Sequence, residues 1–81
     1  MTAGDGPAEA TVKRSVSVAG HRTSVSLEPA FWDALKDIAK EQGLSLAALV
    51  AKVDAARGGA NLSSALRVYA LAWARGQVRA E

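Results

Sequence analysis

Hydrogen-bonding side chains recur at every second position in the segment HRTSVSL, residues 21–27. Arg22 offers a planar fork of N–H donors, and Ser24 and Ser26 offer hydroxyl groups that both donate and accept. A period of two is that of a half-buried strand, so these three side chains are predicted to share one face of a strand. The spacing therefore predicts a polar strand face that carries a single cation.

Positive charge gathers around this strand. The ten residues from 13 to 22 contain no carboxylate and carry Lys13, Arg14, His21 and Arg22. The whole chain has a formal net charge of only +2, so its composition argues weakly for a nucleic-acid partner. The distribution of the charge is more informative than its sum.

A strand of seven residues needs a partner strand. Its second face carries Thr23, Val25 and Leu27, which are predicted to point into an apolar core. Residues 14–18, RSVSV, alternate as well, and the pair Ala19-Gly20 separates the two runs. Such a pair can form a hairpin turn, so the pattern leaves open whether residues 14–18 add an edge strand.

Three helices are predicted after the strand. The first begins at Pro29 and ends at Gly43, a residue suited to a left-handed cap. Ser45 is predicted to cap a second helix, which ends at Gly58-Gly59, and Asn61 to cap a third helix that continues to residue 75.

Two features of these helices concern burial. Trp32 lies one step off the apolar stripe of the first helix, so it is predicted to shield the edge of the core and not to stack on a ligand. The third helix is apolar on two sides, with Leu66 and Ala70 on one side and Val68 and Leu71 on the other. A helix of this kind requires cover on both sides, and part of that cover is expected from another subunit.

The composition argues against an enzyme and against a cofactor. The 81 residues allow one domain; they include no cysteine, which excludes disulfides and thiolate metal sites, and a single histidine. No Gly-rich phosphate loop or catalytic pair is visible. The acids of the first helix alternate with lysines, as on a solvated face.

Both ends of the chain are predicted to be tails, over residues 1–11 and 76–81. The first residues lack the apolar run of a signal peptide, and no stretch approaches the roughly 20 apolar residues of a membrane span. We therefore expect a cytoplasmic protein without membrane attachment.

The segments KRSVSVAGHRTSVSLEPAFWDALKDIA, GLSLAALVAKVD and GGANLSSALRVYAL resemble the ribbon-helix-helix family, and in particular the small ribbon-helix-helix proteins common in alphaproteobacteria. The resemblance implies a mainly α-helical domain over residues 12–75. Its members are intertwined homodimers, in which one strand from each chain forms an antiparallel β-ribbon. Here a third C-terminal helix, and an N-terminal strand if one forms, would be additions to that plan. The dimer core would contain Thr23, Val25, Leu27, Phe31, Leu35, Leu49, Val53 and Leu66.

The resemblance also implies a DNA-binding surface. In members such as the methionine and Arc repressors, the outward side chains of the ribbon enter the DNA major groove. Carried over by position, Arg22, Ser24 and Ser26 would contact bases, although DNA-binding relatives often have longer side chains there than serine. The phosphate contacts would come from Lys13, Arg14, His21 and the start of the second helix at Ser45 and Leu46. The implied function is that of a bacterial transcriptional regulator of the repressor type, which binds double-stranded DNA.

An alternative is a protein-interaction module, either an adaptor or the antidote of a toxin pair, that uses the same dimer fold without sequence-specific DNA binding. Ser24 and Ser26 would then solvate one sheet face, and Ser45 would be a plain helix cap. The third helix would either enlarge the dimer core or expose Tyr69 and Trp73 to a protein partner. Antidotes in this family generally add a flexible tail after the fold, whereas the C-terminus here looks helical and short.

Overall fold

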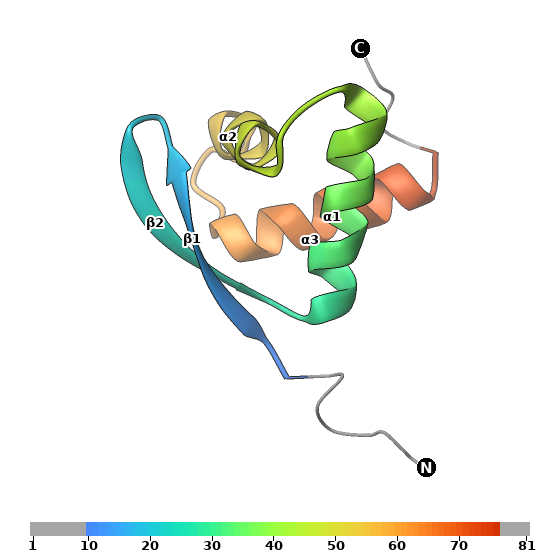
Figure 1. Cartoon of the computed structure of the whole chain (residues 1–81), viewed down its shortest axis with the longest axis horizontal. Coiled ribbons are helices and arrows are strands. Elements are labelled where there is room, and N and C mark those ends of the chain that lie inside the picture. Colours follow the sequence, from blue (N-terminus) through green and yellow to red (C-terminus); the bar gives the residue numbers. More distant parts are fainter. Residues whose placement is uncertain (1–9, 77–81) are drawn as a thin grey trace.

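The computed structural model describes residues 10–76 and consists of a β-hairpin followed by three helices (Figure 1). The hairpin lies along one side of the helices. The predicted tails lie almost wholly outside the described residues. In chain order, the elements are β1 Val12–Val18, β2 His21–Leu27, α1 Pro29–Gln42, α2 Leu46–Ala56 and α3 Leu62–Ala74.

β1 is the partner strand of β2 in this chain. The two strands pair antiparallel, from Val18 opposite His21 at the turn to Val12 opposite Leu27 at the open end. Ala19 and Gly20 form the two-residue turn with positive φ angles of 53° and 83°, as in the mirror-image turns that match the twist of a hairpin. The additional N-terminal strand is thus present. Pairing of β2 with a second copy remains a prediction and would have to use the other edge of β2.

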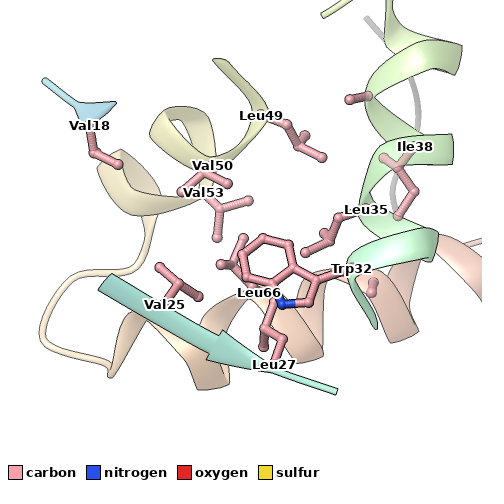
Figure 2. Packing of buried hydrophobic residues seen from close by; sticks show 12 residues of the cluster. Val18, Val25, Leu27, Trp32, Leu35, Ile38, Leu49, Val50, Val53 and Leu66 are labelled. Carbon is pink, nitrogen blue, oxygen red and sulfur yellow. The ribbon is translucent and has the colours of Figure 1, made fainter. Parts of the chain in front are cut away.

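The core lies between one face of the hairpin and the three helices (Figure 2). Residues at alternate strand positions, among them Val18, Val25 and Leu27, are buried against side chains of α2 and α3. Of the side chains assigned to a dimer core, most are buried within the single chain and two are half-buried. The buried ones are Val25, Leu27, Leu35, Leu49, Val53 and Leu66, and the half-buried ones are Thr23 and Phe31.

Trp32 lies inside the core, so the prediction that it shields the edge of the core was wrong. Its side chain is 1% exposed, and its indole N–H donates to the carbonyl oxygen of Val12 over 2.9 Å. The guanidinium of Arg14 lies 5.3 Å from the centre of the ring. Val12 and Arg14 of β1 thus both contact the Trp32 side chain. The helical pattern could not predict these contacts, because it does not show whether residues 12–18 fold back.

The predicted starts of the three helices and the predicted end of the first are confirmed, whereas α2 ends at Ala56, two residues before Gly58. Gly43 follows α1 with a left-handed φ of 72°, and the next N–H, that of Leu44, donates to the carbonyl oxygen of Ala39. The Ser45 hydroxyl accepts from the N–H of Ala48 over 3.0 Å, as expected for the cap of α2. The side-chain oxygen of Asn61 likewise caps α3, accepting from the N–H of Ser64.

α3 is covered on one side only. Leu66 and Ala70 are buried, and Tyr69 is half-buried against the core, where its hydroxyl accepts from the Gln42 amide over 2.7 Å. Val68 and Leu71 on the other side are 65% and 55% exposed. Among the described residues, no helix is long and apolar enough to cross a membrane.

Candidate nucleic-acid interface

The face of the hairpin that points away from the helices is polar along its whole length. The strand register places three pairs there, Lys13 with Ser26, Ser15 with Ser24, and Ser17 with Arg22. Ser26 is half-buried and the other five residues are exposed. We call these six residues the outer ribbon face.

The outer ribbon face carries positive charge and no negative charge. Lys13 lies near the open end of the hairpin and Arg22 beside the turn. They are separated by about four residue steps, or roughly 13 Å along the ribbon. Neither strand contains a carboxylate, and neither cation has an ion-pair partner within residues 10–76. Both side chains are therefore available to an anionic ligand.

The structure brings the predicted base-contacting residues together and adds two residues to them. Arg22, Ser24 and Ser26 share the outer ribbon face, as the period of two implies. Ser15 and Ser17 were not among the predicted site residues. The signal for them was the alternation RSVSV, which assigns them to this face only once residues 12–18 pair with β2.

Two of the predicted phosphate ligands belong to the opposite face of the hairpin. Arg14 is paired with Val25 and His21 with Val18, so their side chains lie on the side that meets the helices. The Arg14 guanidinium stacks on the Trp32 ring there. The register thus separates Arg14 and His21 from Lys13, which remains on the outer ribbon face.

The start of α2 offers backbone donors. The Ser45 hydroxyl is already engaged, because it accepts from Ala48. The N–H groups of Leu46 and Ala47 have no hydrogen-bond partner among the described residues, as is usual in the first turn of a helix. Any anion bound at this helix end would therefore be held by the backbone, assisted by the helix dipole.

An ion pair fixes the junction between β2 and α1. Glu28 follows the last residue of β2, and its Oε1 atom lies 3.0 Å from Nε of Arg67 on α3. Interaction with its own backbone N–H, and then with the Arg67 guanidinium, lowers the pKa of Glu28 below its ordinary value. The pair ties the open end of the hairpin to α3, and thereby helps to fix the orientation of the outer ribbon face.

Comparisons with known proteins agree with this architecture. The ribbon-helix-helix domain family matches residues 11–74. The chain is also similar to the solved structure of an uncharacterized protein from Bordetella pertussis Tohama I, with 33% sequence identity and a TM-score of 0.74 over 96% of this chain and 70% of that chain. No curated protein matches it. The family match spans the hairpin and all three helices, and the chain therefore belongs to the ribbon-helix-helix family.

Proposed function

We propose that the protein is a dimeric DNA-binding regulator of the repressor type, and that the outer ribbon face of β1 and β2 enters the major groove. One observation carries the proposal: the outer ribbon face is exposed, polar and positively charged. The opposite face of the same hairpin packs against the core and holds the ribbon in place. Family membership supports the same function.

The dimensions of the hairpin suit the groove. Paired strands lie about 4.8 Å apart, and the major groove of B-DNA is about 12 Å wide, so two strands with their side chains fit within it. The distance of roughly 13 Å from Lys13 to Arg22 corresponds to about four base-pair steps of 3.4 Å. One hairpin would therefore span the length of a short half-site.

The hairpin differs from the predicted ribbon in the origin of its strands. The sequence predicted a ribbon made of one strand from each of two chains, whereas β1 and β2 of one chain already form a ribbon. If two copies also paired through the free edge of β2, the sheet would have four strands and span about 14 Å between its outer strands. That width exceeds the groove, so we assign groove entry to the hairpin of one chain.

The side chains divide into two roles in this proposal. Arg22 can fork onto a guanine, a contact worth roughly 1–3 kcal/mol of discrimination. The short hydroxyls of Ser15, Ser24 and Ser26 approach base edges but discriminate poorly, because a hydroxyl both donates and accepts. Lys13 at the open end supplies a phosphate contact, and the free N–H groups at the start of α2 offer a second one.

Binding of the full-length protein to DNA from its own promoter region tests the proposal. We expect Arg22→Ala to weaken specific binding roughly 5- to 150-fold, which corresponds to the loss of one bidentate base contact. Lys36→Ala is the matched control, because Lys36 is an exposed cation on α1, outside the outer ribbon face.

Two outcomes would contradict the proposal. If the parent protein showed no DNA retention at low salt, the function would be wrong and the adaptor alternative would gain support. If Arg22→Ala bound the same site as tightly as the parent protein, the assignment of base contacts to this face would be wrong.

A further inference from the structure

The turn of the hairpin lies far from the point at which the chain enters the helices. Glu28 is the residue between β2 and α1 (Figure 1). Arg22 lies beside the turn, six positions from Glu28, or about 20 Å along an extended strand. A rotation of the hairpin by about 10° around Glu28 would therefore move Arg22 by about 3.5 Å. Hydrogen bonds span about 2.7–3.2 Å, so such a displacement would break a base contact of Arg22.

Apolar contacts hold the hairpin on the helices without fixing its angle. Leu27 at the open end and Val18 at the turn are both buried in the core. Burial of apolar surface is non-directional, so these two contacts define the position of the hairpin better than its angle. Charge-assisted hydrogen bonds are directional and can fix an angle.

The ion pair between Glu28 and Arg67 is a contact of this kind. The distance between Oε1 and Nε is 3.0 Å, and the side chains of Arg67 and Glu28 are 33% and 32% exposed. This partial shielding from water makes the attraction stronger than that of a fully exposed pair. Arg67 follows Leu66, which is 0% exposed, so α3 offers the pair a fixed base.

A second directional contact holds the other strand of the open end. The indole N–H of Trp32 donates to the carbonyl oxygen of Val12, which lies opposite Leu27 in the register. This hydrogen bond acts on β1, whereas the ion pair acts where β2 ends. Loss of the ion pair would therefore leave the open end held through β1 only.

We propose that Glu28 and Arg67 are positioning residues for DNA binding. Their ion pair sets the angle of the outer ribbon face and thereby places Arg22 against the bases. Neither side chain belongs to that face, so both act indirectly. The inference rests on the proposed function and adds to it two residues outside the interface. Specific binding depends on the pair, whereas the general attraction to phosphates requires no fixed angle.

Binding of the full chain to specific and to unrelated DNA tests the inference. Glu28→Ala removes a negative charge, which by itself would strengthen binding to DNA. Loss of the ribbon angle has the opposite effect, and we expect specific affinity to fall roughly fivefold or more, while affinity for unrelated DNA does not fall. Glu28 makes no side-chain cap bond to α1, so the substitution removes no helix cap.

Asp33→Ala is the matched control. It removes the same charge from an exposed position of α1 that has no ion-pair partner among residues 10–76, and it should not weaken specific binding. Affinities are compared under conditions in which far-UV circular dichroism shows every variant to be folded. A loss of stability is then not counted as a loss of affinity.

A double variant tests whether both residues act through one contact. Arg67→Ala should also lower specific affinity, and Glu28→Ala/Arg67→Ala should lose about as much as a single variant, because both changes break the same pair. A pure charge effect makes a different prediction. The double variant has the net charge of the parent protein and would then bind like it.

Residual dipolar couplings of the free protein give a readout that is independent of DNA. The N–H bonds of β1 and β2 should change their angle relative to α3 in Glu28→Ala but not in Asp33→Ala. Unchanged couplings or undiminished specific affinity in Glu28→Ala would overturn the inference and leave the proposed function intact. A parent protein that binds no DNA would contradict the proposed function, and with it the role of the pair in DNA binding.

Discussion

Individual residues set the geometry of the ribbon. Alternation alone placed Arg22, Ser24 and Ser26 on one face, because successive side chains of a strand point to opposite sides. The role of Arg14 was harder to predict, since its face depends on where β1 pairs and its stacking depends on Trp32. Spacing along the chain thus predicts which side chains share a face, but not which distant ring they contact.

Ala19 is the weak point of the hairpin turn, because it has a φ of 53° and is the only residue other than glycine with a positive φ among residues 10–76. An L-residue in this region costs roughly 1–2 kcal/mol, whereas Asn-Gly is the preferred pair for such a turn. We expect Ala19→Asn to raise the free energy of unfolding by about 0.5–1 kcal/mol in urea titrations.

Ala55→Asn is the control for this prediction. Ala55 is exposed within α2, where asparagine is a poorer helix former than alanine, so that variant should lose up to about 0.7 kcal/mol. A loss of stability in both variants would mean that the turn does not adopt the described conformation.

The ion pair between Glu28 and Arg67 predicts a dependence of stability on pH. Because the folded pKa of Glu28 is lowered, its contribution is complete above the ordinary glutamate value of about 4.3 and is lost as the pH falls through the lower folded pKa. Urea midpoints measured between about pH 6 and pH 3 should fall less steeply in Glu28→Gln than in the parent protein.

The exposed carboxylate of Asp33, which has no ion-pair partner among the described residues, supplies the matched comparison. Asp33→Asn should keep the acid-dependent loss seen in the parent protein. A profile for Glu28→Gln as steep as that of the parent would rule out a stabilising role of the pair.

At the scale of elements, the sequence predicted most helix ends but not how the helices pack. Pro29, Gly43, Ser45 and Asn61 mark helix ends by local chemistry, which acts within a few residues. Burial of Trp32 depends on β1, twenty positions earlier in the chain. Local rules could not predict this contact, because it joins elements that are distant in sequence.

Trp32 connects α1 to β1, so its replacement should lower the stability of the fold. Trp32→Phe keeps an aromatic ring in the core but removes the N–H that donates to Val12 and reduces the contact with Arg14. We expect a loss of about 1–2 kcal/mol in the free energy of unfolding. Trp73→Phe, at a half-buried position of α3, should cost less. Equal losses of unfolding free energy in both variants would argue against a stabilising hydrogen bond from the Trp32 indole to Val12.

At the scale of the whole molecule, polar and apolar surfaces are segregated. The cations of the outer ribbon face lie on the hairpin, and the exposed apolar ridge lies on α3. The core is closed within one chain, so both surfaces remain exposed to solvent. Net charge alone, at +2, would not have indicated either surface.

The small number of cations on the outer ribbon face predicts a moderate salt dependence of DNA binding. If the Lys13 side chains of both copies in a dimer each neutralise one phosphate, this contact should contribute a slope of log K against log salt on the order of −2. Lys13→Gln should make the slope shallower by about 2, whereas Lys36→Gln should leave it unchanged. An unchanged slope in Lys13→Gln would remove Lys13 from the phosphate contacts.

By itself, the sequence determined the three helices, most of their ends and the two faces of β2, because these follow from spacing and from chemistry that acts over a few residues. The tertiary structure decided that β1 pairs with β2 in the same chain, that Trp32 is buried beneath β1, and that Ser15 and Ser17 join the outer ribbon face. It also decided which side of α3 remains exposed. These outcomes depend on contacts between distant segments, whose formation is governed by the packing of the whole core and not by any local pattern.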